Sequence, residues 1–224
     1  NIAHEINQFN QELVKSHEQL EEKNVELAHL NQEIESTLKE TIYTIGLIEA
    51  HRSQETNYHT KRVTEYSRLL GELSGLSRRD SYVLHTASPL HDIGKLAIPD
   101  AILKKAGELD EYEYEIIKSH PEIGYEMLRH SDREILKAAA IIAHQHQEKW
   151  DGSGYPQGLK GEEIHIFGRI VSLVDVFDAL SMQRCYKDAW STDKVLEHLR
   201  QESGKQFDPG LVDLFISNLD AFMQ

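Results

Sequence analysis

The chain has 224 residues, of which 39% are hydrophobic and 28% charged, enough for one buried core with an extension. A formal net charge of -14 argues against a nucleic-acid polymer or an anionic membrane surface as the main partner, because both would repel the chain. The single cysteine, Cys185, excludes an internal disulfide, and no apolar run reaches the roughly 20 residues of a membrane span, so we expect a cytoplasmic protein.

Residues 1–41 predict a coiled-coil helix. An apolar residue recurs every seven positions, and neither glycine nor proline interrupts the stretch. The repeating residues are Ile6, Leu13, Leu20, Leu27 and Ile34. Placing them at d puts three asparagines and His17 at a, which favours a parallel homodimer. A lone amphipathic helix packed on the domain is the alternative. Since the chain starts at Asn1 without methionine, we expect it to be cut from a longer protein.

Residues 42–224 predict a helical domain. Glu55, His59 and Arg62 are spaced four and three apart, which puts them on one helix face, and Gly75 should end that helix. Ser77 is the expected cap of a helix running into His91. Further helices are expected over 101–130, 135–143 and 166–182, with two more beginning at Ser191 and Pro209. Because no alternating strand pattern of useful length occurs, the fold class is all-α.

His91 and Asp92 are adjacent potential metal ligands, followed by Gly94 and Lys95. Imidazole and carboxylate together suit iron, manganese, zinc or nickel, and the aspartate can bridge two ions. An isolated His-Asp pair is more often a helix-end carboxylate beside a solvated histidine. Asp175 is a further candidate, since an aspartate inside a mostly apolar helix is costly unless a positive charge meets it. The chain's 13 histidines are a compositional hint of metal.

From about Ile42 to Phe215 the chain resembles the HD-GYP domains, a branch of the HD metal-dependent phosphohydrolases. The matching motifs are Glu55…His59-x-x-Arg62, His91-Asp92-Ile93-Gly94-Lys95, Ser119-His120-Pro121-Glu122-Ile123-Gly124, Glu148-Lys149-Trp150-Asp151-Gly152-Ser153-Gly154-Tyr155-Pro156 and Asp175-Val176-Phe177-Asp178-Ala179-Leu180. The resemblance implies a helical HD-domain bundle that hydrolyses cyclic di-GMP to linear pGpG, in some members onward to GMP.

The resemblance also implies a role for each matching residue. Lys95 is expected to protonate the leaving oxygen or to neutralise a phosphate oxygen, and Asp92 to bridge two divalent transition-metal ions. Iron or manganese is expected first, with nickel or zinc as alternatives. The implied metal ligands are His59, His91, Asp92 and Asp175, with His120 and His146 for the second ion and Glu55 for a third. The implied substrate-binding residues are Gly154, Tyr155, Arg184 and Lys187.

The sequence departs from the family pattern at three places. Gln147 stands where the family has a second histidine, and an amide oxygen is a poorer ligand for a transition metal, so a third ion loses support. His144 should point elsewhere on the helix and is not expected to replace it. Tyr58 stands in the segment before His59 where the family usually has Thr-Gly-Asn, and Cys185 replaces a common proline.

Two alternatives to cyclic di-GMP hydrolysis remain, the first of which is motivated by Gln147. The first is a regulatory module that binds metal or cyclic di-GMP with little turnover and acts by contact with diguanylate cyclases of the GGDEF type or with an adaptor. The second is a phosphodiesterase for another cyclic dinucleotide.

Overall fold

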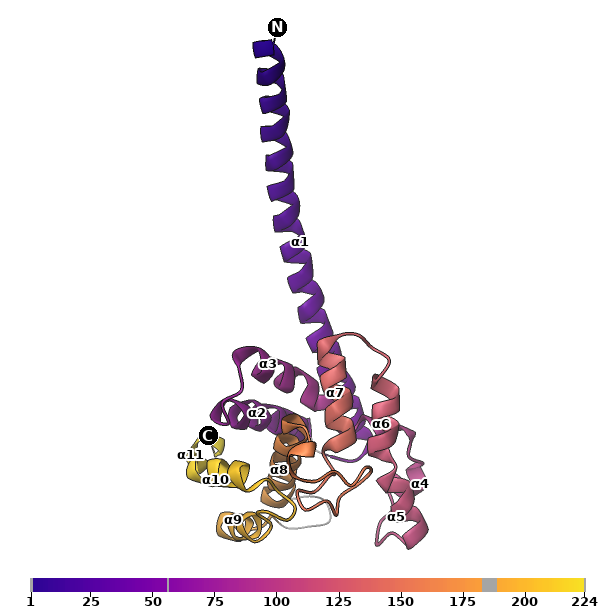
Figure 1. Cartoon of the computed structure of the whole chain (residues 1–224). Helices are drawn as coiled ribbons and strands as arrows, with labels where there is room; N and C mark the ends of the chain where they lie inside the picture. Colours follow the sequence, from indigo (N-terminus) through magenta and orange to yellow (C-terminus); the bar gives the residue numbers. More distant parts are fainter. Residues whose placement is uncertain (1, 56, 183–188, 224) are drawn as a thin grey trace. The chain divides into compact units, whose positions relative to one another are not determined.

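The computed structural model describes residues 2–55, 57–182 and 189–223, and its regular elements there are helices, with one isolated β-bridge between Ser203 and Phe207 (Figure 1). The α-helices are α1 (Ile2–Arg52), α2 (Asn57–Leu73), α3 (Arg78–Ala87), α4 (Asp100–Leu103), α5 (Glu111–Lys118), α6 (His120–Leu128), α7 (Glu134–Gln145), α8 (Ile166–Ser181), α9 (Thr192–Gln201), α10 (Pro209–Ser217) and α11 (Leu219–Phe222). Three short 3-10 helices, η1 (Ser88–Leu90), η2 (Ile93–Ala97) and η3 (Gly161–Glu163), complete the set. The all-α prediction is confirmed.

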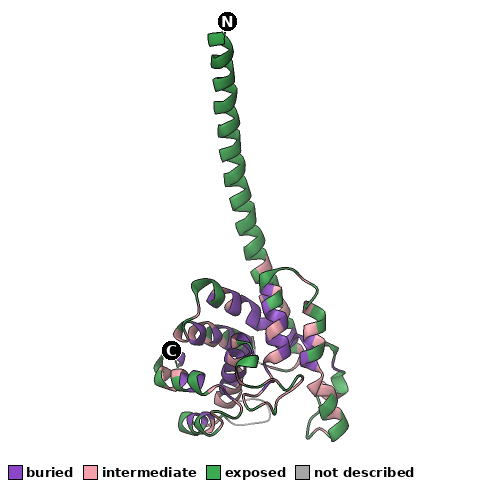
Figure 2. Ribbon diagram, viewed as in Figure 1, coloured by how far each residue is buried: buried purple, intermediate pink, exposed green. Residues whose placement is uncertain are grey.

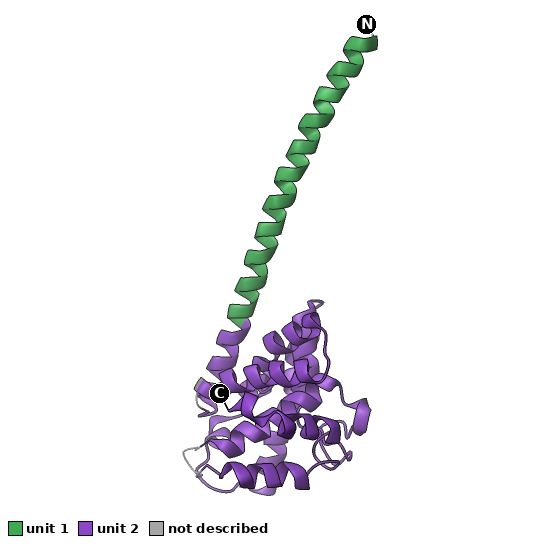
Figure 3. Cartoon of the chain, turned by 90° about the vertical axis from the view of Figure 1, so that its left-hand side faces the viewer, with its two compact units in different colours: residues 1–41 green, residues 42–224 purple. Residues whose placement is uncertain are grey.

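The chain forms two compact units, Asn1–Thr41 and Ile42–Gln224 (Figure 3). In the first, residues 2–37 of α1 are all exposed (Figure 2). Its heptad residues are no exception, since Ile34 is 48% and Leu20 59% exposed. The predicted long helix is confirmed, whereas its pairing with a second chain stays a prediction. None of the described helices is both long enough and apolar enough to cross a bilayer.

The second unit is built around four helices that pack in a ring. Helix α2 packs on α3, α3 on α7, α7 on α8, and α8 back on α2. Their facing sides supply fully buried residues such as Leu70, Leu84, Ile142 and Phe177. Burying each such side chain stabilises the fold by about 1.5–3 kcal/mol, so these four helices form the main core of the second unit.

Capping side chains set the starts of several helices, among them the predicted cap Ser77. Ser77 accepts a hydrogen bond from the backbone N–H of Asp80 at the start of α3, and Asp110 forms a capping box with Glu113 at the start of α5. Asp208 caps α10, whose first residue is Pro209. These local signals satisfy backbone donors that the helix itself leaves unpaired.

The helix expected to run into His91 ends earlier, which corrects the prediction. Helix α3 stops at Ala87, and Pro89 lies in the short helix η1. Proline has no N–H and cannot extend an α-helical hydrogen-bond ladder. His91 and Asp92 therefore lie in a turn between η1 and η2. The prediction that Glu55 belongs to the helix of His59 is also corrected, since Glu55 precedes α2.

Two contacts fix this turn in place. A Cβ on Gly94 would lie 1.9 Å from the carbonyl oxygen of His120, so only glycine allows η2 to approach α6 this closely. From α1, the Arg52 guanidinium donates to the carbonyl oxygens of Lys95 (3.0 Å) and Ile98 (2.7 Å). The turn is thus held between the end of α1 and the start of α6.

Candidate metal centre

Four buried histidines share one hydrogen-bonding arrangement. Each donates from Nδ1 to an oxygen that can only accept, which leaves the lone pair of Nε2 available as a ligand. The acceptors are Asp178 Oδ2 for His59 (2.7 Å), the Ser88 carbonyl for His91 (3.0 Å), the Ile117 carbonyl for His120 (2.7 Å) and the Ala143 carbonyl for His146 (3.0 Å). The tautomer and ring orientation of all four are therefore fixed by the fold.

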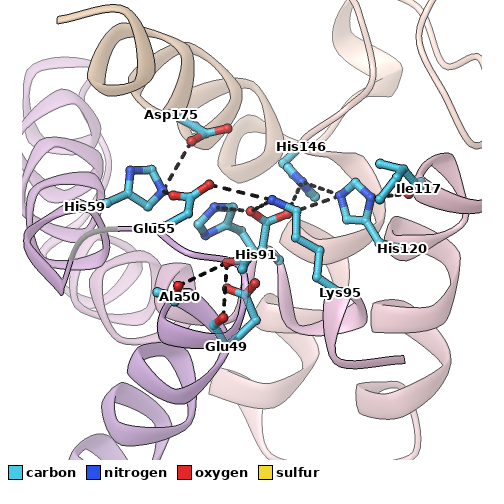
Figure 4. Close-up of polar contacts among 12 residues, drawn as sticks. Glu49, Ala50, Glu55, His59, His91, Lys95, Ile117, His120, His146 and Asp175 are labelled. Atoms are coloured by element: carbon cyan, nitrogen blue, oxygen red, sulfur yellow. Dashed lines mark hydrogen bonds and ion pairs between the residues drawn. The ribbon is translucent and has the colours of Figure 1, made fainter. Parts of the chain in front are cut away.

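The free nitrogens gather with two aspartates into two groups (Figure 4). One group is His59, His91 and Asp175; the other is Asp92, His120 and His146, and within each the ligand atoms lie within 4.8 Å of one another. Asp92 faces both groups. Its Oδ2 is 3.2 Å from His91 Nε2, while its Oδ1 is 3.2 Å from His120 Nε2 and 3.4 Å from His146 Nε2.

This arrangement calls for positive charge at its centre. The Nε2 atoms of His120 and His146 are 3.3 Å apart, and with both Nδ1 atoms protonated two lone pairs face each other unless a cation lies between them. Among the described residues, His91 Nε2 and Asp92 Oδ1 are buried without a hydrogen-bond partner. A set of imidazoles and carboxylates suits transition metals, so the two groups fit a binuclear metal site.

In the metal-free chain, protons bound to two of the histidines supply this positive charge. Burial alone lowers the pKa of His59, but its hydrogen bonds to Asp178 and Glu55 outweigh burial and raise that pKa to about 10. Burial likewise opposes protonation of His91, yet Asp92 raises its pKa to about 9. Burial dominates at His146 and lowers its pKa. A bound ion would replace the protons on His59 and His91.

Lys95 and Glu55 lie beside the two groups. Lys95 Nζ donates to Asp92 Oδ2 at 2.6 Å and is 3.8 Å from Glu55 Oε1. Burial alone would lower the pKa of Lys95, but the charges of Asp92 and Glu55 outweigh it and raise the pKa, so the ammonium stays charged. Glu55 Oε2 lies 2.9 Å from His59 Nε2, close to the first group but outside both.

The loop with Gly154 and Tyr155 is attached to the end of α7. Tyr155 Oη donates to Gln147 Oε1 at 3.2 Å, so Gln147 faces the loop. A Cβ on Gly154 would lie 2.2 Å from the Lys149 nitrogen, which shows how closely the two backbones approach. Glu148, next along, accepts hydrogen bonds from the backbone N–H groups of Gln157 (2.7 Å) and Leu159 (3.1 Å). Arg184 and Lys187 lie outside the described residues.

His144 belongs to a different contact. Its ring stacks on Tyr125 with centroids 4.2 Å apart, and its Nε2 lies 2.8 Å from Glu122 Oε2. It is in neither group of ligands, so it does not compensate for Gln147.

Sequence reasoning did not assign roles to two acidic residues near the centre. Asp178 orients His59 and also pairs with Arg62, whose Nη2 lies 3.0 Å from Asp178 Oδ2. Its position three residues after Asp175 is the only signal in the sequence. Glu49 is buried near the end of α1, and burial followed by the charge of Asp92 raises its pKa to about 7. Its place in the apolar run Ile48 to Ala50 hints at burial.

Comparison with known proteins agrees with this geometry. The family model described as HD domain matches residues 10–211. A 3′3′-cGAMP-specific phosphodiesterase of Vibrio cholerae is 44% identical over 191 residues, which cover 85% of this chain and 37% of the relative. The cyclic di-GMP phosphodiesterase response regulator RpfG of Xanthomonas campestris is 42% identical over 190 residues, which cover 85% of this chain and 50% of the relative.

A solved structure shows the same fold. The crystal structure of a cyclic GMP-AMP-specific phosphodiesterase of Vibrio cholerae matches with a TM-score of 0.64 at 22% identity, covering 83% of this chain and 50% of that one. The chain belongs to the HD domain family, in its HD-GYP branch. It spans about half or less of the length of these relatives.

Proposed function

We propose that the chain is the output part of a bacterial signalling protein, a metal-dependent phosphodiesterase that hydrolyses cyclic di-GMP to linear pGpG. The observation that carries this proposal is the Asp92 carboxylate, whose two oxygens face two separate groups of ligands. Enzymes that cleave phosphodiesters commonly use two ions held in this manner. The relatives are named as phosphodiesterases for cyclic dinucleotides, and these names support a cyclic dinucleotide as the substrate.

Within this proposal, His59, His91, Asp175, Asp92, His120 and His146 hold two divalent transition-metal ions, of which iron or manganese is favoured. Such a pair supplies Lewis-acid polarisation of the phosphodiester and a hydroxide nucleophile. Lys95 has the position and the charge to neutralise a phosphate oxygen or to give its proton to the leaving 3′ oxygen. The burial of Asp92 and the histidines excludes bulk water, which strengthens each of these electrostatic contacts.

Four further residues belong to the proposed substrate site: Gly154, Tyr155, Arg184 and Lys187. Glu55 remains the candidate for a third ion. Gln147 argues against that ion, because its side-chain oxygen already accepts the hydrogen bond from Tyr155. A two-ion centre is therefore the favoured state.

We also propose that residues 1–41 form a coiled-coil signalling helix that pairs two chains in parallel, and that residues 42–224 form the HD-GYP domain. The exposed heptad stripe supports the pairing, because large apolar side chains repeated in this way are normally covered by a second helix. A cytoplasmic location completes the proposal, since the substrate is an intracellular messenger.

Two other functions have a specific observation in their favour. Hydrolysis of 3′3′-cyclic GMP-AMP is favoured by the relative that is 44% identical and specific for that dinucleotide. A regulatory module of low turnover, acting on GGDEF-type or adaptor partners, is favoured by Gln147 at the position of a family histidine.

Metal content and turnover on one anaerobically purified sample test the proposal. Two transition ions per chain, with linear product from cyclic di-GMP, is the expected result. Faster turnover of cyclic GMP-AMP would reassign the substrate and keep the reaction. If the chain holds one ion or none and forms no product from either dinucleotide, even after iron or manganese is added back, the regulatory module becomes the favoured function.

A further inference from the structure

Tyr155, an expected substrate-binding residue, forms a cluster with a tyrosine and a lysine to which sequence reasoning gave no role. Lys118 Nζ lies 5.8 Å from the centre of the Tyr114 ring and 5.4 Å from the centre of the Tyr155 ring. Both distances are within cation–π range, so one ammonium is shared by two aromatic faces. Tyr114 and Lys118 come from α5, whereas Tyr155 comes from the loop after α7.

The cluster flanks the second group of metal ligands. Lys118 ends α5, two residues before His120. Tyr155 donates to Gln147, the residue after His146. The cluster is therefore joined through Lys118 and Gln147 to the segments that carry His120 and His146.

Both sides of the cluster are held in position. The capping box of Asp110 and Glu113 fixes the start of α5. On the other side, the Tyr155 backbone N–H donates to the Gln147 carbonyl at 3.3 Å, in addition to the contact through its hydroxyl. A preorganised aromatic surface loses little conformational entropy when a ligand binds.

The cluster is nevertheless open to a ligand. Tyr114 is 50% exposed, and the Lys118 side chain is 29% exposed. Lys118 Nζ pairs with Glu115 at 2.8 Å, but that carboxylate is itself 61% exposed and such surface pairs contribute little. An ammonium has three donors, so Lys118 can keep this pair and still donate to a ligand.

We propose that Tyr114, Lys118 and Tyr155 form the subsite for a purine base of the substrate and that Lys118 selects guanine. This inference rests on the proposed function. A ribose joins each base to its phosphate, so a phosphodiester at the metal centre places a base near its rim. Aromatic side chains stack on any base. A lysine donor favours guanine, which presents two acceptors, O6 and N7, over adenine, which presents N7 beside an amino group.

The test compares cyclic di-GMP, 3′3′-cyclic GMP-AMP and cyclic di-AMP as substrates of the metal-loaded chain. Lys118→Met should raise KM for cyclic di-GMP about tenfold, with a much smaller change for cyclic di-AMP and little change in kcat. Tyr114→Leu should raise KM for all three, because stacking does not depend on the base. Lys105→Met is the matched control, since Lys105 is also partly exposed and pairs with Glu113 at the other end of α5.

Metal content and melting temperature, measured on each variant, distinguish a lost contact from a lost fold. The subsite is refuted if the wild-type chain hydrolyses a cyclic dinucleotide and Lys118→Met, with its ions and stability intact, leaves the KM ratio between cyclic di-GMP and cyclic di-AMP unchanged. Failure of the proposed function looks different. The wild-type chain would then hold its ions and cleave bis(p-nitrophenyl) phosphate, yet neither bind nor cleave any of the three dinucleotides.

Discussion

At the residue scale, Asp92 is the side chain that connects the two groups of candidate ligands. Asp92 alone reaches both groups of ligands, and its charge keeps Lys95 and His91 protonated in the metal-free chain. Lys95 in turn acts on Asp92. Burial alone would raise the pKa of the Asp92 carboxyl group, but the Lys95 ammonium helps to lower it well below the usual range. The Asp92 carboxyl group is therefore ionised at neutral pH, which is the state that a metal ligand needs.

We predict that Asp92→Ala abolishes the binding of both ions and all hydrolysis. Removing the shared carboxylate leaves only two neutral histidines, His120 and His146, in one group, and takes the negative charge of Asp92 away from the other. Asp92→Asn keeps the volume of the side chain and removes its charge, so this variant distinguishes the loss of a metal ligand from the effect of a cavity. Metal content per chain is the measurement, with Asp213→Ala, an exposed aspartate on α10, as the control. A fully active Asp92→Ala variant would refute the site.

The raised histidine pKa values predict a pH dependence of metal affinity. His59, with a pKa of about 10, and His91, with a pKa of about 9, are protonated at neutral pH in the metal-free chain, and an ion binds only the neutral ring. Affinity for a divalent ion such as Co²⁺ should therefore rise between about pH 6 and about pH 9, by about tenfold per unit for each proton displaced. Titration calorimetry in two buffers of different ionisation enthalpy counts those protons.

The stability of the metal-free chain should change in the opposite direction. Both histidines have a pKa in the folded state above the ordinary value of 6.5, so their stabilisation is present below that pH and is lost as the pH rises toward 9 and 10. The melting temperature of the metal-free chain should fall over this window. Metal affinity that is flat with pH, together with no proton release, would contradict both expectations.

At the scale of elements, the centre depends on a junction of short segments. The turn between η1 and η2 carries two ligands, and the start of α6 carries a third. Their approach requires Gly94, whose missing side chain leaves room for the His120 carbonyl. Backbone packing of this kind tolerates no added atom, because neither segment can move without moving its ligands.

We predict that Gly94→Ala lowers the free energy of unfolding by about 1–3 kcal/mol or more and reduces metal content. The new methyl group would meet backbone atoms, at 1.9 Å from the His120 oxygen and 2.7 Å from the Gly124 nitrogen. Urea denaturation measures the change in the free energy of unfolding, and metal analysis measures the change in metal content. The control is Gly71→Ala in α2, where the nearest atoms are ends of leucine side chains at 3.1 Å, which can shift. Equal effects at both positions would remove the special role of Gly94.

At the scale of the whole molecule, the exposed stripe of α1 predicts that two chains associate. We expect Leu20→Glu with Leu27→Glu to convert a dimer to a monomer, because four charges in a paired molecule would then face an apolar seam. Sedimentation equilibrium measures the change. Val25→Glu is the control, since Val25 is 70% exposed on the same helix but lies off the heptad stripe. Metal content should stay the same in both the double variant and the control.

The sequence by itself determined the fold class and the elements. Capping residues such as Ser77, Asp110 and Asp208 act within one turn, so their effect could be recognised without any tertiary information. The heptads predicted the long helix for the same reason. The metal-ligand set was predicted from motifs in the right order, and the structure brings six of those side chains into two groups. Arg184 and Lys187, which lie outside the described residues, stay predictions.

Only the tertiary structure decided which atoms meet. His59 and Asp178 are 119 residues apart in the chain, and no local pattern predicts that one orients the other. The proline that ends the helix before His91 was visible, but the turn that follows is set by packing against α6. The sequence presented Gln147 only as a missing metal ligand, whereas in the structure its side chain accepts a hydrogen bond from Tyr155. Lys118 contacts two tyrosine rings that come from different elements. Side-chain chemistry is local, whereas distances depend on how the whole helical bundle packs.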